Sequence, residues 1–190
     1  VTKVRKFDRK TGKPLGSIAV SGATFLNDVC ADAAGVVFVT DTGMKPDFSD
    51  SGTDALVKIT EGDKVEVTKL PGRKPNGVCT LPGGVLCEVS WTTGEVFLEG
   101  PKGATVLTKL PKAQLDGVVA LAGDTLLVSS WEGKCVWRVA RIPGKDGVSV
   151  QEVATGLEAP ADIGYDRKRQ RLLIPLFTEN KVVLWPLAGS

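Results

Sequence analysis

The chain alternates between short hydrophobic runs and short polar turns from one end to the other. Continuous runs such as residues 36–39 (VVFV) are typical of strands buried on both faces, whereas alternating runs such as residues 65–68 (VEVT) are typical of half-exposed edge strands. No apolar run approaches the ~20 residues that a membrane-spanning helix needs. The pattern therefore predicts an all-β protein.

A short signature recurs four times and divides the predicted strands into groups. It centres on a polar residue that is followed by an apolar run, a turn and a second apolar run, and these polar residues are Asn27, Asn76, Asp116 and Asp162. They recur at intervals of roughly 40–50 residues, and repeats of that length with only strand-like content are typical of a β-propeller. In a propeller the first strand of each blade lines the central channel. We therefore expect one Asn or Asp per blade at the same depth around the axis.

We expect a single β-propeller domain over residues 1–190, built from four-stranded antiparallel blades, with about four blades present of a probable six. We expect a half blade over residues 1–20 and a three-stranded last blade over residues 160–187. Between them we expect three full blades, over residues 24–70, 75–110 and 114–155. Because propellers close with 4–8 blades, we expect further blades before Val1. The alternative is a small closed propeller whose N-terminal strands complete the last blade. Open blade faces would favour self-association.

Composition excludes several classes of function. The net charge of +2 provides no basic footprint for nucleic acid and no clear attraction to membranes. The absence of histidine removes Ser-His-Asp and Cys-His mechanisms and imidazole metal ligands. The four cysteines form no CxxC pair, which argues against a zinc cluster, and we expect them as free, buried thiols, with a disulfide as the alternative: Cys30, Cys79, Cys87 and Cys135. The scattered Lys and Arg side chains are expected on the solvated surface.

The signature residues are candidate metal ligands. Asn27 and Asn76 can each supply an amide oxygen and Asp116 a carboxylate, while Asp28 and Asp162 are further candidates. Calcium takes 6–8 oxygen ligands, and a mixed Asn/Asp set without His or a thiolate pattern favours calcium over softer metals, although another divalent cation would also fit. The alternative is that these residues cap turns and strand starts for local backbone reasons.

Three aromatic residues follow equivalent strands. Trp91 and Trp131 end the second strands of their repeats, and Phe177 follows the corresponding strand of the last repeat. If these strand ends reach the mouth of the channel, the aromatic side chains would line a substrate pocket together with Asp162. The alternative is ordinary packing between blades.

These motifs together resemble the senescence-marker-protein/gluconolactonase family of six-bladed propellers. The resemblance covers essentially the whole chain, and its last part is similar to a bacterial gluconolactonase-like or NHL-type branch. It is carried by Phe25-Leu26-Asn27-Asp28, Pro75-Asn76-Gly77, Leu115-Asp116-Gly117, and residues 160–166 (PADIGYD) and 173–177 (LIPLF).

The resemblance implies an axial divalent metal, usually calcium, held by a Glu of the first blade and by residues matching Asn27, Asn76 and Asp116. The Glu would lie before Val1. It also implies a calcium-dependent hydrolase of a small-molecule lactone or related ester, in which Asp116 is a candidate general base. Fold does not dictate function, so two alternatives stay open. One is a non-catalytic propeller that binds a ligand or protein, and the other is a folding or assembly unit without activity.

Overall fold

The computed structural model describes residues 1–100 and 103–187. In this part of the chain the regular elements are antiparallel β-strands and two 3-10 turns, Glu61–Asp63 and Pro82–Gly84. No helix in the described ranges is long and apolar enough to cross a membrane. The predicted all-β class is confirmed.

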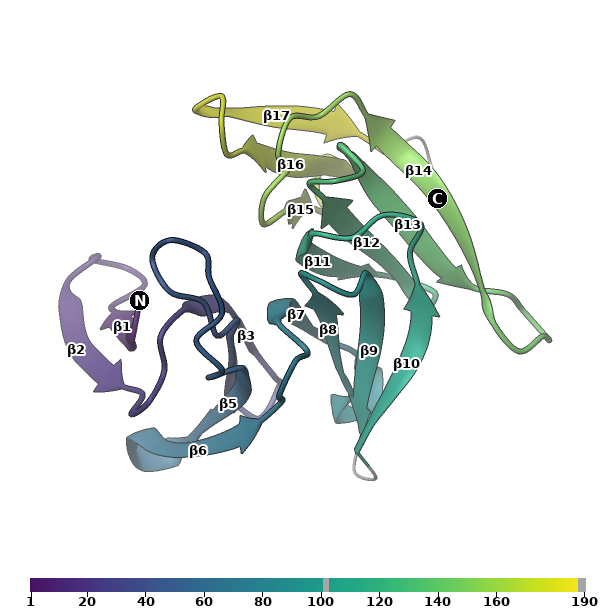
Figure 1. Cartoon of the computed structure of the whole chain (residues 1–190). Helices are drawn as coiled ribbons and strands as arrows, with labels where there is room; N and C mark the ends of the chain where they lie inside the picture. The colour runs from purple at the N-terminus through teal and green to yellow at the C-terminus, as the bar shows by residue number, and fades with distance from the viewer. Residues whose placement is uncertain (101–102, 188–190) are drawn as a thin grey trace. The chain divides into compact units, whose positions relative to one another are not determined.

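The chain divides into two compact units, Val1–Pro75 and Asn76–Ser190. Unit 1 contains a two-stranded ribbon and a four-stranded sheet in sequential order (Figure 1). The ribbon is β1 (Lys3–Phe7) and β2 (Pro14–Ala19), and the sheet is β3 (Leu26–Ala31), β4 (Val37–Asp41), β5 (Ala55–Thr60) and β6 (Lys64–Lys69). Ile18 of the ribbon and Val20, which follows β2 directly, share a buried core with Val39 and Val57 of the sheet, so the ribbon packs on that sheet.

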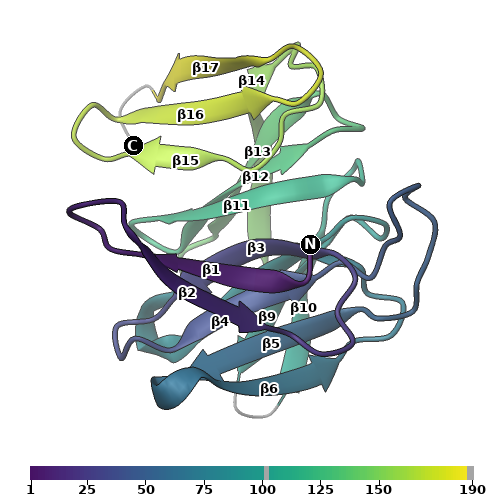
Figure 2. The ribbon, with the colours of Figure 1, turned by 90° about the vertical axis from the view of Figure 1, so that its left-hand side faces the viewer.

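Unit 2 contains three sheets, each with its strands in sequential order. The first is β7 (Pro75–Thr80), β8 (Leu86–Ser90), β9 (Glu95–Gly100) and β10 (Gly103–Lys109). Its first residue, Pro75, is also the last residue of unit 1. The second is β11 (Leu115–Leu121), β12 (Thr125–Ser130), β13 (Cys135–Arg141) and β14 (Val148–Thr155). The third has three strands, β15 (Gly164–Asp166), β16 (Arg171–Leu176) and β17 (Lys181–Pro186), which lie side by side in Figure 2.

The burial of each strand follows its position in the sheet. Every residue of the second strands β8 and β12 is buried, whereas most residues of the fourth strands β6 and β10 are exposed. One core, with Val89 and Trp137, joins the first two sheets of unit 2, and another, with Leu127 and Ile174, joins the second and third. Hydrophobic packing between neighbouring sheets explains why the second strands lack the alternation of a half-exposed sheet.

The cysteines are all free, as predicted. Cys87 and Cys135 are fully buried, but the expectation of burial is wrong for Cys30 and Cys79, which are only half-buried. Burial raises the pKa of the Cys135 thiol to about 12, with a smaller contribution from the negative charge of Glu152. This thiol therefore stays protonated and is neither a nucleophile nor a metal ligand at neutral pH.

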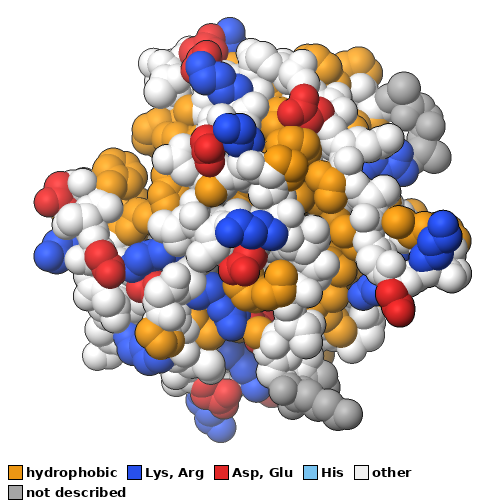
Figure 3. Space-filling model, turned by 45° about the vertical axis from the view of Figure 1, so that its right-hand side comes forward, with side chains coloured by type: hydrophobic (Ala, Val, Ile, Leu, Met, Phe, Trp, Pro, Cys, Tyr) orange, Lys and Arg blue, Asp and Glu red, His pale blue; other side chains and the backbone are white. Residues whose placement is uncertain are grey.

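Charged side chains are mixed by sign on the surface. On the face drawn in Figure 3, Lys and Arg lie among Asp and Glu, and hydrophobic side chains reach the surface between them. The small net charge of +2 is thus not gathered into a basic patch on this face. The expectation that neither nucleic acid nor a membrane is a partner stays a prediction.

Candidate functional site at the start of the inner strands

A one-residue β-bulge interrupts the pairing of the inner strand at the signature. Between β3 and β4, Leu26 pairs with Asp41 but Val29 pairs with Val39, so one extra residue lies on the inner strand. Between β11 and β12 the same offset separates the pairs Leu115–Ser130 and Val118–Val128. Bulges re-aim side chains and are frequent beside functional sites. The signature therefore has a structural cause, because its polar residue lies within the bulge.

The register of the last sheet places Asp162 one position later than the sequence predicted. Pro160 bridges Leu176 at the position where Leu115 pairs with Ser130, so Ala161 is the equivalent of Asp116. Asp162 occupies the position of Gly117 instead. The expectation of one Asn or Asp per blade at the same depth is thus wrong for the last repeat, because the bulge position there is an alanine.

A buried hydroxyl of the second strand stabilises the bulge. Ser129 Oγ accepts a hydrogen bond from the Gly117 backbone N–H and donates one to the Ala161 carbonyl, both at 2.8 Å. In unit 1, Thr40 Oγ1 accepts from the Asp28 N–H at 3.1 Å in the same way. The hydroxyl replaces the ladder bond that the extra residue removes. Ser129 also fixes the start of the last sheet against the bulge that holds Asp116.

The glycines of the signature allow neighbouring strand starts to touch. A Cβ atom on Gly77 would lie 2.3 Å from the Asp116 carbonyl oxygen, and one on Gly117 would lie 2.7 Å from Asp162 Oδ1. Both distances are shorter than side chains tolerate. Asn76-Gly77, Asp116-Gly117 and Asp162 therefore lie in succession within unit 2. In the sequence, Gly77 and Gly117 each stand directly after the polar residue of the signature, and this fixed place is the local signal of the close approach.

The polar residues of this site differ in exposure. Asn76 and Asp116 are 3% and 9% exposed, whereas Asp162 keeps an open face to solvent. The protein atoms packed around the rest of the Asp162 carboxyl raise its pKa, and a hydrogen bond from the Ile163 backbone opposes this effect. Asn27 belongs to unit 1, is exposed, and donates from Nδ2 to Thr42 Oγ1 at 3.0 Å.

The side-chain oxygens of these residues are of the type that hard cations bind. Amide and carboxylate oxygens are the ligands that calcium prefers, and Asn76 and Asp116 supply one of each. Residues 1–100 and 103–187 contain no cluster of three or more His, Cys, Asp or Glu side chains placed to hold a metal. A cation at this site would therefore depend on amide oxygens, backbone carbonyls and water as well as on the Asp116 carboxylate.

The three predicted aromatic residues form a continuous row. The ring centroids of Trp91 and Trp131 are 5.1 Å apart and nearly perpendicular, and those of Trp131 and Phe177 are 5.0 Å apart with a tilt of 40°. The two indoles are half-buried, and Phe177 is 63% exposed. The Trp131 indole N–H is buried without a hydrogen-bond partner among the described residues. We call these three residues the aromatic row.

Backbone hydrogen bonds hold the aromatic row beside the signature. The Gln114 N–H donates to the Trp91 carbonyl at 2.8 Å, and the Trp131 N–H donates to the Gln114 carbonyl at 3.0 Å. Gln114 adopts a left-handed backbone with φ of 51°, which costs a non-glycine residue about 1–2 kcal/mol. Because second strands end where inner strands begin, the aromatic row and the residues Asn76 and Asp116 lie at the same edge of the sheets.

Unit 1 contains a buried ion-pair network that the sequence did not indicate. Lys74 Nζ donates to Asp54 Oδ1 at 2.7 Å, to the Gly43 carbonyl at 3.0 Å and to the Asp50 carboxylate. Desolvation lowers the pKa of Lys74, but its hydrogen bonds and charge interactions with Asp50 and Asp54 outweigh this and raise it. The expectation of a solvated lysine is wrong here, because these partners lie 20 or more residues away and fasten the segment 42–54 to Lys74.

Comparison with known proteins identifies the fold. No protein-family model and no curated protein matches the chain. Among solved structures, virginiamycin B lyase from Staphylococcus aureus matches with a TM-score of 0.68 and 15% identity, covering 100% of this chain and 64% of the lyase. A gluconolactonase from Xanthomonas campestris matches with a TM-score of 0.68 and 17% identity over 90% of this chain and 61% of that protein.

A chain of a nidogen/laminin complex matches with a TM-score of 0.73 and 13% identity, over 91% of this chain and 66% of that one. The chain thus spans less than two thirds of each of these three structures. The predicted β-propeller fold is confirmed, as is the structural likeness to gluconolactonase propellers over part of their length. At these identities the likeness concerns the fold alone.

Proposed function

We propose that this chain belongs to a calcium-dependent hydrolase of a lactone or related ester. The observation that carries the proposal is the arrangement in unit 2, where Asn76, Asp116, Asp162 and the aromatic row share one edge of three consecutive sheets. The likeness to a gluconolactonase propeller supports it at the level of the fold. Oxygen donors beside an apolar surface are what a metal-assisted ester hydrolysis requires.

Asn76 and Asp116 would hold the cation through one amide and one carboxylate oxygen. The role of Asn27, which belongs to unit 1, stays a sequence prediction. When bound, the cation would polarise the ester carbonyl. Asp116 would accept the proton of the attacking water. Asp162, with its raised pKa, would lie on the substrate side. The aromatic row would bind the apolar part of the substrate and exclude water from it.

The chemistry needs no histidine. A histidine-to-alanine variant of the virginiamycin B lyase is described as catalytically inactive, and this chain contains no histidine. A carboxylate base beside a cation is therefore the better supported route for this chain, since Asp116 and Asp162 are the titratable groups at the site.

The test is calcium-dependent turnover of 4-nitrophenyl acetate and δ-valerolactone by the chain and two matched variants. Asp116→Asn keeps the shape of the side chain but removes its charge and basicity, and should reduce turnover at least about 100-fold, as expected for loss of a general base. Asp146→Asn removes the same charge from an exposed turn and should leave turnover unchanged. Turnover that survives in Asp116→Asn, or that ignores a chelator, would overturn the proposal.

A non-catalytic binding propeller is the second candidate. The exposed Phe177 at the end of the aromatic row and the match to a chain of a nidogen/laminin complex favour it. Calcium that raises the melting temperature without supporting ester turnover would identify this function, since a ligand that binds the native state alone stabilises it.

Self-association is a third possibility that the last sheet supports. In the described part of the chain, β17 is an edge strand of its sheet, and Val182 and Leu184 on it are 57% and 51% exposed. Exposed apolar edges favour pairing with another copy. Light scattering should show a mass above 20.0 kDa that returns to the monomer value in a Val182→Lys/Leu184→Lys variant.

A further inference from the structure

Arg138 occupies a position between two sheets where the pattern of burial favours an apolar residue. Along β13, Cys135, Trp137 and Val139 face the first core of unit 2, and Val136 faces the core shared with the last sheet. Alternation along the strand places Arg138 on the same side as Val136. The guanidinium group is therefore directed to the space between the second and third sheets of unit 2.

Among the residues that the structure describes, no carboxylate pairs with this cation. Its direct neighbours across the sheet are Leu127 on β12 and Gln151 on β14, and Glu152 pairs with Trp137 on the opposite face. Within residues 1–100 and 103–187, Arg138 makes no side-chain hydrogen bond and no ion pair. A half-buried charge without a partner costs free energy that a bound anion would recover.

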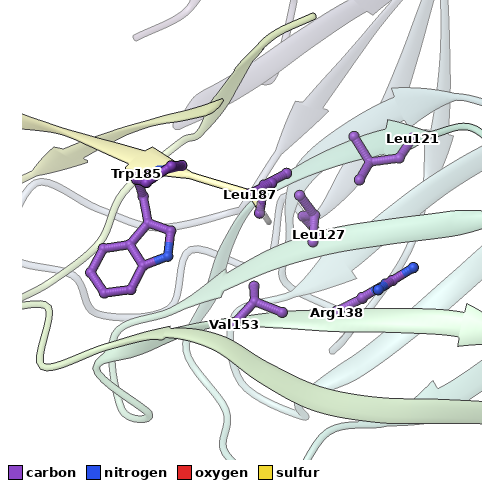
Figure 4. A pocket seen from close by; sticks show the side chains of 7 residues that line it. Leu121, Leu127, Arg138, Val153, Trp185 and Leu187 are labelled. Atoms are coloured by element: carbon purple, nitrogen blue, oxygen red, sulfur yellow. The ribbon is translucent and has the colours of Figure 1, made fainter. Parts of the chain in front are cut away.

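A pocket adjoins Arg138. It has a volume of about 250 Å³, and besides Arg138 its lining is apolar: Leu121, Leu127, Val153, Trp185, Pro186 and Leu187. Figure 4 shows the indole of Trp185 at one end and Arg138 with Leu121 at the other. This volume is below the ~300–1,000 Å³ of sites for drug-sized ligands, so the pocket suits a small molecule.

We propose that this pocket binds a small monocarboxylate with an apolar tail. The planar guanidinium of Arg138 would hold the carboxylate through two parallel hydrogen bonds, and the tail would lie against Trp185, Leu187 and Val153. A phosphate or sulfate would satisfy the cation but would leave the apolar walls exposed to water. The inference does not depend on ester hydrolysis, since none of these residues belongs to the candidate catalytic site.

The test is titration of the full chain with hexanoate, acetate and hexanol by calorimetry and ligand-observed NMR. Hexanoate should bind with a dissociation constant of about 1 mM or tighter. Acetate lacks the tail and hexanol lacks the charge, so both should bind at least about tenfold more weakly.

Variants separate the pocket from general attraction of anions. Arg138→Gln should weaken hexanoate binding about tenfold to a hundredfold, the loss expected for a charge-assisted contact. Arg167→Gln removes the same charge from an exposed position and should not change it. Leu121→Phe keeps Arg138 but fills the pocket, and should also weaken hexanoate binding. This variant tests the proposal even if Arg138→Gln does not fold.

Equal affinity for hexanoate and acetate would overturn the proposal, as would equal hexanoate affinity of Arg138→Gln and Arg167→Gln. The absence of binding at about 10 mM hexanoate, tenfold above the expected dissociation constant, would also overturn it.

Discussion

The replacement Gly117→Ala tests whether neighbouring inner strands meet backbone to backbone at the candidate site. The added Cβ would lie 2.4 Å from the Ile163 amide nitrogen and 2.7 Å from the Asp162 Cα. These distances are about 1 Å shorter than the ~3.5 Å at which non-bonded heavy atoms attract one another. Because the obstructing atoms belong to the backbone or directly adjoin it, a change of side-chain rotamer cannot relieve the contact.

The expected cost follows from what must move. Overpacking of this kind costs about 1–3 kcal/mol. A displaced start of the last sheet would also lose the two hydrogen bonds of Ser129 Oγ, to the Gly117 N–H and the Ala161 carbonyl, at about 1 kcal/mol each. The sum is about 3–5 kcal/mol, a large share of the ~5–15 kcal/mol that stabilises a typical domain. The melting temperature should fall by about 6–20 °C.

Urea denaturation followed by tryptophan fluorescence, with thermal melting followed by circular dichroism, measures this loss. Gly164→Ala is the matched control, because its Cβ would meet only Leu173 side-chain atoms at 3.7–3.8 Å on a strand of the same kind. The control should change the free energy of unfolding by no more than about 0.5 kcal/mol. Equal stability of the two variants would refute the close approach of Asp116-Gly117 to Asp162.

Three further predictions concern the same elements. Ser129→Ala should cost about 2–3 kcal/mol in urea denaturation, because it leaves the buried Gly117 N–H and Ala161 carbonyl without their partner, whereas Ser149→Ala, which removes an exposed bond, should cost much less. Asp54→Asn should cost about 2–3 kcal/mol because it breaks the buried pair with Lys74, whereas Glu158→Gln should cost less than about 1 kcal/mol. Because the pKa of Lys74 is raised, the stabilisation by the Lys74–Asp54 pair stays intact up to pH 10.5. This stabilisation is lost as the pH rises through the folded-state pKa of Lys74. Asp162→Asn should raise stability at pH 7, where burial disfavours the ionised carboxylate. This gain in stability should vanish below pH 3.8, where the unfolded-state carboxyl is protonated as well. An equal gain at both pH values would contradict the raised pKa of Asp162.

The strands and their grouping were predictable because they depend on local pattern. Runs such as residues 36–39 carry the hydrophobic content of a doubly covered strand, and the recurring signature sets the length of a repeat. The observed sheets lie within the predicted blade ranges, and the last sheet has the three strands that the sequence predicts. Period-2 alternation and turn residues act over a few positions, so a single sequence contains this information.

The candidate site was predictable only in part. Asn76, Asp116 and the aromatic residues were identified because each stands at a fixed place in its repeat. The one-residue shift of Asp162 was not, since the segment 159–163 fits the signature in either register and only the pairing of Pro160 with Leu176 distinguishes them. A change of register by one residue places a different residue at the bulge, although the residue types in the segment stay the same.

The sequence by itself determined the all-β class, the repeat length and the residue types available for chemistry, because these follow from composition and short-range periodicity. Only the tertiary structure decided which residues meet. It joined Trp91, Trp131 and Phe177 into one row, buried Lys74 against Asp54, and placed Arg138 beside an apolar pocket without a carboxylate. The contacts within the aromatic row and between Lys74 and Asp54 join residues 20 or more positions apart. The packing of neighbouring sheets and of a long loop, which no local pattern encodes, brings such residues together.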